Sequence, residues 1–159
     1  MIEIKKASEK DLDLILSFIK KLAEYEKLSD CVVATTELLK EWLFEKEKAY
    51  VLIAYYDFKP VGFALYFNNF STFLGKCGIY LEDLFVDSDY RGLGIGKAIF
   101  RELAKIAYEN NYERIDFCCL NDNEPSLKFY EKIGAFRQDD WGMLRLDKIG
   151  IDKLANKKI

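Results

Sequence analysis

The sequence contains no histidine among its 159 residues. This excludes nucleophilic catalysis by Ser-His or Cys-His arrangements and any metal site that depends on imidazole ligands. A proton transferred by this protein must therefore move through a carboxylate, tyrosine, lysine, cysteine or water.

Cysteine is also scarce. Cys31, Cys77, Cys118 and Cys119 are the only four, and no two of them have C-x-x-C spacing. Such a pattern is typical of reduced thiols that pack as small hydrophobic side chains, rather than of disulfides or a metal site. We therefore expect no bound metal.

Long apolar runs are missing as well. No segment is long enough to cross a bilayer, and no basic segment followed by an apolar one opens the chain. The net charge of −3 disfavours nucleic-acid binding, which usually requires a basic surplus. We expect a cytoplasmic protein without a signal peptide, a membrane partner or a nucleic-acid partner.

Apolar runs predict the strands. These runs cover residues 2–6, 49–56, 61–67, 78–86 and 115–120, and a β-rich tail covers 141–146. A turn at 57–60 predicts an antiparallel hairpin, and we expect a polar, glycine-containing loop over 68–76. The strand–loop–helix–strand order after residue 78 implies a right-handed crossover and a parallel strand pair.

Apolar residues at helical spacing predict the helices. They run from the capping pair Ser8 and Asp11 to Tyr25, from Thr35 or Thr36 to Leu43, over 95–110, over 126–133 before Gly134, and weakly at the terminus. Half of the residues are apolar, and the length suits one core. We expect a single α/β domain, 1–159, with a mixed, largely antiparallel sheet flanked by helices.

The most informative stretch runs from Leu81 to Lys97. It reads as an apolar strand, a short acidic turn and then Arg91-Gly92-Leu93-Gly94-Ile95-Gly96, which opens a helix. Backbone N–H groups at a helix start bind phosphate, and glycines let the phosphate approach the backbone closely. The stretch predicts a phosphate-binding loop.

Two common nucleotide-binding loops fit this stretch poorly. A P-loop requires G-x-x-x-x-G-K-[ST], but Arg91 stands at the first glycine position and Ala98 follows Lys97. A dinucleotide-binding fold requires G-x-G-x-x-G near the first strand. Here the spacing is G-x-G-x-G, and several antiparallel strands precede it.

The arginine and its glycines resemble a third motif, the [RQ]-x-x-G-x-[GA] pyrophosphate-binding motif of the GNAT acetyltransferase superfamily. Further segments resemble its diamine acetyltransferase branch, which includes spermidine/spermine and thialysine acetyltransferases. These are Ala23-Glu24-Tyr25-Glu26, Tyr80-Leu81-Glu82-Asp83, Ser88-Asp89-Tyr90-Arg91-Gly92, Asn123-Glu124-Pro125-Ser126, Phe129-Tyr130 and Trp141. The 57–60 turn and the 135–141 loop look shorter than in the animal enzymes, and the second borders the expected amine site.

This resemblance implies a GNAT-type fold whose parallel strand pair lies at the cofactor cleft, and acetyl-CoA as co-substrate. We expect backbone groups of Leu84, Phe85 and Val86 to bind the pantetheine arm. The pyrophosphate would bind Gly92, Leu93, Gly94, Ile95, Gly96 and Lys97, with added charge from Arg91. The resemblance adds Asn123 and Ser126 as cofactor contacts, although Ser126 could instead be a helix N-cap.

The expected reaction moves the acetyl group to a primary amine of a small cationic substrate, namely a polyamine, a diamine or a lysine-like amino acid. Such an amine is protonated at pH 7, because its pKa is about 10.4. We expect Glu82 to be the general base acting through water, or alternatively only to attract the ammonium group. Asp83 would share this role or, as we favour, pair with a lysine. Tyr130 would protonate the leaving thiolate, or alternatively be a core aromatic.

By resemblance, the amine contacts are Tyr25, Glu26, Glu82 and Asp139. Acids and an aromatic ring suit a flexible cation, although Glu26 and Asp139 could simply be solvated surface charges. The resemblance also implies a homodimer. Two alternatives remain open: an acetyltransferase for protein amines or aminoglycosides, and a non-catalytic CoA-binding regulatory protein.

Overall fold

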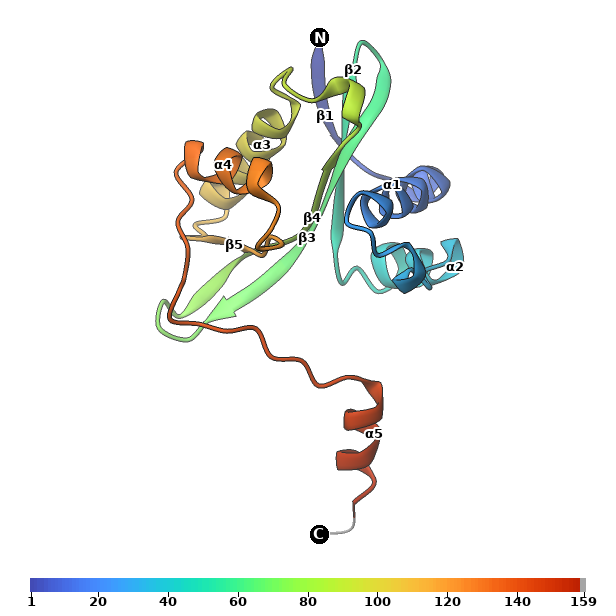
Figure 1. The fold of residues 1–159 in the computed structure, drawn as a ribbon, viewed down its shortest axis with the longest axis vertical. Helices are drawn as coiled ribbons and strands as arrows, with labels where there is room; N and C mark the ends of the chain where they lie inside the picture. The colour runs from blue at the N-terminus through green and yellow to red at the C-terminus, as the bar shows by residue number, and fades with distance from the viewer. Residues whose placement is uncertain (158–159) are drawn as a thin grey trace. The chain divides into compact units, whose positions relative to one another are not determined.

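A computed structural model describes residues 1–157 of the chain (Figure 1). The strands are β1 (Ile2–Lys6), β2 (Tyr50–Tyr56), β3 (Lys59–Ser71), β4 (Lys76–Val86) and β5 (Ile115–Phe117). The α-helices are α1 (Leu12–Tyr25), α2 (Thr36–Leu39), α3 (Ile95–Glu109), α4 (Glu124–Lys132) and α5 (Lys148–Ala155). Helix α2 continues as a π-helix, η3 (Lys40–Glu45), and short 3-10 turns are η1 (Glu9–Asp11), η2 (Ser29–Cys31) and η4 (Ser88–Tyr90).

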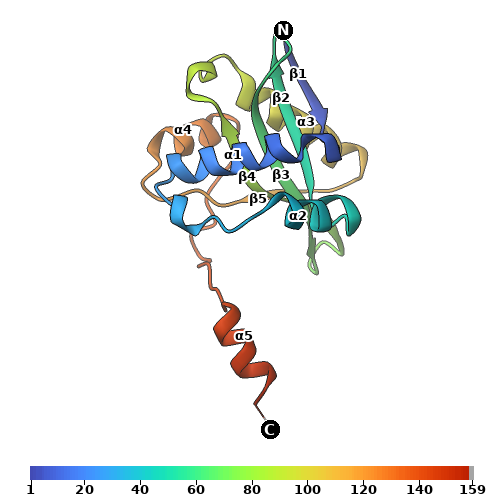
Figure 2. The same cartoon turned by 90° about the vertical axis from the view of Figure 1, so that its right-hand side faces the viewer.

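The five strands form one sheet in the order β1-β2-β3-β4-β5. Neighbouring strands are antiparallel except β4 and β5, which are parallel. Helices α1 and α2 cover one face and α3 covers the other, as Figures 1 and 2 show from two sides. The mixed, largely antiparallel α/β fold predicted from the apolar pattern is confirmed.

The core between the sheet and α1 is built from alternating strand residues and one stripe of α1. The stacked rings of Phe18 and Phe63 lie at its centre, 5.5 Å apart. Its buried members are Ile15, Phe18, Leu43, Val51, Ile53, Phe63 and Phe85. On the other face, α3 buries Ile95, Ile99 and Leu103. The sheet is therefore packed on both faces.

The predicted helix caps are present. The backbone N–H of Ser8 donates to the carboxylate of Asp11 (2.7 Å), so the capping pair closes η1, which leads into α1. Thr35 is the cap of α2, because its hydroxyl accepts a hydrogen bond from the N–H of Leu38 (3.2 Å).

Several predicted segments differ from the structure. The strand predicted over 115–120 is shorter, because β5 ends at Phe117. The loop expected over 68–76 is shorter, because β3 continues to Ser71 and the amide of Asn68 donates to the carbonyl of Gly78 (3.1 Å) across the strand pair. The side-chain amide of Asn68 is thus satisfied within a hairpin. The strand expected over 141–146 does not form in the described chain. Apolar side chains alone do not make a strand when its backbone groups have no ladder partner.

The chain divides into two compact units, Met1–Leu120 and the part from Asn121 onward. The first holds the sheet and α1 to α3, and the second holds α4 and α5. In the second, α4 begins earlier than predicted, because Asn123 is its N-cap and accepts a hydrogen bond from the N–H of Ser126 (3.4 Å). The alternative role of Ser126 as the N-cap is therefore wrong. No described helix is both long and apolar enough to span a membrane.

Candidate functional site

Strand β4 carries a β-bulge at its centre. Asp83 stands opposite Leu65 on β3, whereas the next pair is Leu81 with Tyr66, so Glu82 is the extra residue. A bulge changes the direction in which the following side chains point and often lies next to an active site. Glu82 is exposed here, whereas Asp83 is half-buried opposite Leu65, a residue that packs against the α1 core.

The bulge coincides with the point where β4 loses one neighbour. Within the described chain, β5 pairs with β4 only at residues 79–81. From Glu82 to Val86 the edge of β4 on that side has no strand partner, and an extended, amide-bearing ligand can bind such an edge as an added strand. Leu84, Phe85 and Val86, the expected pantetheine contacts, lie in this segment, although the carbonyl of Val86 already accepts a hydrogen bond from Nε of Arg91 (3.0 Å).

Two acidic side chains act on Asp83 near the bulge. Burial, followed by the charges of Glu82 and Glu26, raises the pKa of Asp83 to about 7. Burial also raises the pKa of Glu26, which follows the last residue of α1. No described lysine or arginine forms a salt bridge with Asp83, so the pairing favoured from the sequence does not form within residues 1–157. The sequence signal for its true environment was only its position beside Glu82 in an apolar strand.

Tyr80 lies just before the bulge. Its hydroxyl is 3.2 Å from the sulfur of Cys118, and its ring stacks on Phe67 with centroids 5.0 Å apart. The hydrogen bond to Cys118, burial and nearby negative charges raise the pKa of Tyr80 to about 12. This phenol therefore keeps its proton at neutral pH. From the sequence, Tyr80 was noted only as part of the Tyr80-Leu81-Glu82-Asp83 segment, and no chemical role was predicted for it.

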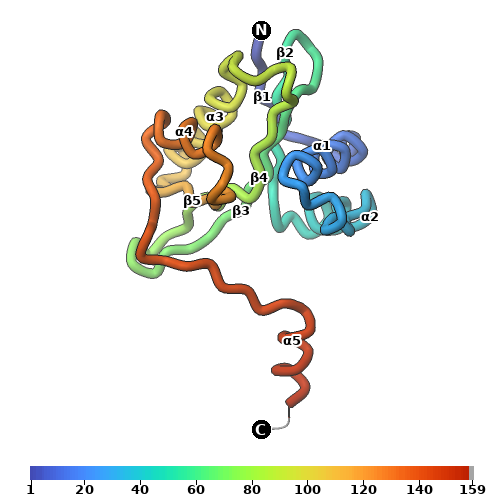
Figure 3. Tube along the Cα trace, in the orientation of Figure 1, coloured from blue at the N-terminus to red at the C-terminus, as the bar shows by residue number. Residues whose placement is uncertain are grey.

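The glycine loop joins η4 to α3, and Figure 3 traces this path from β4 into the helix. Gly92 has φ +78° and Gly94 has φ +87°, a region that favours glycine. A Cβ at either position would meet nothing within 4 Å, so the requirement is conformational rather than steric. Gly94 is the N-cap of α3, and the first N–H groups of a helix have no acceptor within it. The backbone at residues 92–97 therefore fits an anion such as a pyrophosphate.

Arg91 opens this loop, but its guanidinium lies on α1. Its central carbon is 4.5 Å from the ring centroid of Tyr25 and 5.8 Å from that of Phe85. Both distances are within the range of cation–π contact. The structure thus brings together Tyr25, an expected amine contact, and Arg91, an expected cofactor contact.

Four expected site residues belong to the second unit and are described within it. Asn123 and Ser126 meet at the N-cap of α4, and Tyr130 is a half-buried residue of that helix whose ring lies 5.5 Å from that of Phe129. Asp139 is exposed, and its carboxylate accepts a hydrogen bond from Nε of Arg137 (3.1 Å). The contacts within this unit are compatible with the expected roles and with the alternatives of a packed aromatic and a surface charge.

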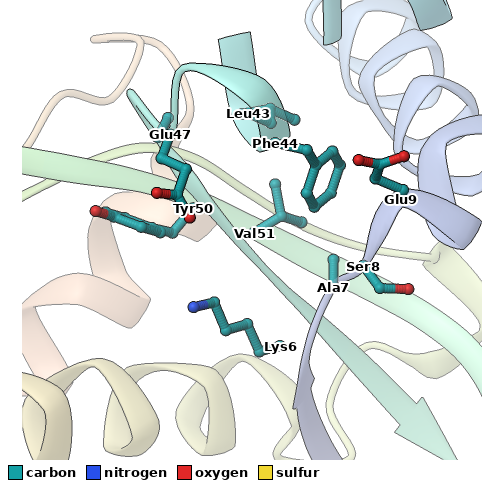
Figure 4. Close-up of a pocket in the computed structure, with 10 residues that line it drawn as sticks. Lys6, Ala7, Ser8, Glu9, Leu43, Phe44, Glu47, Tyr50 and Val51 are labelled. Atoms are coloured by element: carbon teal, nitrogen blue, oxygen red, sulfur yellow. The ribbon is translucent and has the colours of Figure 1, made fainter. Parts of the chain in front are cut away.

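A hollow of about 240 Å³ lies elsewhere, at β1, β2 and the end of η3 (Figure 4). Its lining is Lys6, Ala7, Ser8, Glu9, Leu43, Phe44, Glu47, Ala49, Tyr50 and Val51. None of the expected site residues lines it, so we do not place the active site there.

In the part of the chain that the structure describes, no cluster of three or more carboxylate or cysteine side chains is arranged to hold a metal ion.

Comparison with known proteins agrees with the fold and the loop. Thialysine N-epsilon-acetyltransferase from Bos taurus is 33% identical over 168 aligned residues, which cover 98% of each chain. Spermidine/spermine N(1)-acetyltransferase-like protein 1 from Homo sapiens is 31% identical over 92% of this chain and 22% of its own length. A solved integron cassette protein from the mobile metagenome of V. cholerae is 32% identical with a TM-score of 0.81, and the match covers 98% of both chains.

Residues 17–135 match the model of one family, described as acetyltransferase (GNAT), and this match includes β4, the glycine loop, α3 and Tyr130. It spans well over half of the chain. The chain belongs to the GNAT acetyltransferase family and is an acetyl-CoA-dependent N-acetyltransferase.

Proposed function

We propose that this enzyme acetylates a primary amine of a small cationic substrate, namely a polyamine, a diamine or a lysine-like amino acid. One observation carries the proposal: the negative charges of Glu82 and Glu26 act on Asp83, and Glu82 and Asp83 follow the point where β4 separates from β5. Grouped carboxylates attract a substrate with more than one positive charge. The names of the thialysine and spermidine/spermine relatives support this class of acceptor.

We propose that both substrates bind together and that the amine attacks acetyl-CoA directly. The edge of β4 at Leu84, Phe85 and Val86 would bind the pantetheine arm, and residues 92–97 the pyrophosphate. Asn123 and Ser126 would add further contacts from the start of α4. The unpaired edge and the helix start at Gly94 support this placement.

Glu82 is the proposed general base. It would accept a proton from the ammonium group through water, and the neutral nitrogen would then attack the thioester carbonyl carbon. Asp83 would share this proton, because a carboxyl group whose pKa is near 7 accepts a proton at neutral pH better than an ordinary carboxylate does. The bulge supports this division, since it leaves Glu82 exposed and Asp83 half-buried.

Tyr130 is the proposed general acid. When the carbon–sulfur bond breaks, the CoA thiolate leaves with the bonding electron pair and takes the phenolic proton. The nitrogen, now bonded to the acetyl carbon, loses its remaining extra proton to give a neutral amide, and this proton balances the one that the phenol gave up. A tyrosine, whose ordinary pKa is about 10, holds that proton at pH 7. Its position on α4, which begins at the expected cofactor contacts Asn123 and Ser126, supports the role.

Tyr25, Glu26 and Asp139 are the proposed further amine contacts. Glu26 is half-buried and its charge acts on Asp83, and both observations support a place for Glu26 in the site.

We also propose that the enzyme is a cytoplasmic homodimer. Exposed apolar side chains in the second unit, such as Trp141 (77% exposed) and Leu144 (96%), support self-association.

A coupled assay of CoA thiol release tests the proposal. The panel contains spermidine, a short diamine, thialysine, an aminoglycoside and a peptide with a free N-terminus. Turnover of the first three with little turnover of the last two is the expected result. Turnover of only the aminoglycoside or the peptide would instead support the alternative acceptors.

A further inference from the structure

We propose that Arg91 and Tyr25 form a clamp that couples acetyl-CoA binding to the amine site. Arg91 acts in it as a positioning residue: it ties the glycine loop to the end of α1. The proposal rests on the proposed function in one respect, namely that the end of α1 contacts the amine.

Two contacts, one helical turn apart, join α1 to the segment from Asp87 to Arg91, which leads into the loop. Nζ of Lys21 lies 2.9 Å from the carboxylate of Asp87, and the ring of Tyr25 lies under the guanidinium of Arg91. Residues i and i+4 of a helix lie on one face, so Lys21 and Tyr25 point the same way. Their partners lie at the two ends of η4, which they hold against α1.

Arg91 also contacts β4. Its Nε donates to the carbonyl of Val86 (3.0 Å), and its guanidinium lies near the ring of Phe85. No described carboxylate forms a salt bridge with it. Arg91, the residue that opens the phosphate loop, therefore contacts both the strand expected to hold pantetheine and the helix end expected to meet the amine.

This arrangement predicts positive coupling between the two substrates. A pyrophosphate bound at residues 92–97 would fix the loop, and the loop would fix the end of α1 through the stacked pair. Linkage makes this coupling reciprocal between the two ligands. Because Tyr25 fixes Arg91 before any amine binds, a change at Tyr25 should also alter CoA affinity without amine. If Arg91 instead left Tyr25 to bind the phosphate, the clamp would not transmit this effect.

The test is calorimetric titration of CoA into variants without any amine. Tyr25→Leu removes the ring, Tyr25→Phe keeps it, and Tyr108→Leu is the matched control at an exposed tyrosine on α3. We expect Tyr25→Leu to weaken CoA binding about 5-fold or more, the lower range of measured couplings, with Tyr25→Phe and Tyr108→Leu near wild type. Thermal unfolding of each variant shows whether it is folded. If Tyr25→Leu does not fold, Arg91→Met disrupts the stacked pair from the other residue.

A double variant identifies the path. If Tyr25 acts through Arg91, Tyr25→Leu causes no further loss in an Arg91→Met background. Equal CoA affinity of Tyr25→Leu and Tyr108→Leu, or fully additive losses in the double variant, would overturn the clamp. Arg101→Met, at an exposed arginine on α3, controls for the loss of positive charge. Because no amine is present, failure of the clamp is distinguishable from failure of the proposed acceptor class, which would appear as no turnover by the wild-type enzyme.

Discussion

Glu82 and Asp83 are neighbours in sequence but occupy different environments, because a β-bulge falls between Leu81 and Asp83. Glu82 is exposed as the unpaired residue, and Asp83 is half-buried with a pKa of about 7. Two adjacent carboxyl groups with different environments are suited to different parts of a proton transfer. The first prediction below concerns the effect of Asp83 on stability, and the second concerns the effect of Glu82 on catalysis.

Removing the charge of Asp83 should stabilise the protein increasingly as pH rises. The pKa of Asp83 is about 7 in the folded protein against an ordinary value of 3.8, so the folded state binds more protons between these values. The free energy of unfolding of the wild type therefore falls with pH in this window, by at most about 1.4 kcal/mol per pH unit. Asp83→Asn lacks this loss, so its advantage should grow from pH 4 to 7 and then level off.

Urea unfolding of both proteins at pH 4.5, 6 and 8 measures the difference. A difference that stays constant with pH, or that shrinks toward pH 8, would contradict the burial of this carboxyl group.

Glu82→Gln should lower kcat by about 10²- to 10⁴-fold, the usual contribution of a general base. The residue is exposed and is the extra residue of the bulge, so the substitution should leave the melting temperature nearly unchanged. Glu24→Gln, at an exposed position of α1, is the matched control. A change confined to the KM for amine, with kcat intact, would assign Glu82 to electrostatic attraction alone.

Tyr130→Phe should reduce kcat more than it raises either KM, because the phenolic proton is needed only when the thiolate leaves. The ring and its packing beside Phe129 are retained in this variant. Steady-state kinetics with varied acetyl-CoA and amine make the measurement. Wild-type kcat in Tyr130→Phe would remove Tyr130 from the mechanism and leave it as a packed aromatic.

Gly94→Ala should cost about 1 kcal/mol of stability and weaken CoA binding, because Gly94 has φ +87° at the start of α3. Gly142→Ala is a matched control. A Cβ at Gly142 also meets nothing within 4 Å, but its φ lies outside the left-handed region. Thermal unfolding and CoA titration of both variants test this, and equal effects would show that the loop conformation is unimportant.

The apolar periodicity was sufficient to predict most strands and helices, since positions such as Ile99 and Leu103 repeat at the period of their element. The glycine motif predicted the loop, because the conformation of a loop of this kind depends on residues that are adjacent in the sequence. Other features depend on long-range packing. The bulge at Glu82 is a mismatch of register with β3, and the stack of Arg91 on Tyr25 joins residues far apart in the chain. The missing strand at 141–146 shows that an apolar run also needs a pairing partner.

The most direct test of the central proposal is mass spectrometry of the amine after incubation of the wild-type enzyme with acetyl-CoA and the substrate panel, with released CoA thiol measured in parallel. The proposal predicts a mono-acetylated polyamine, diamine or thialysine, with one thiol released per acetylated amine, and more than 10²-fold less product from Glu82→Gln. Thiol release without an acetylated cationic amine, or no acetylation of these amines at any pH, would contradict it.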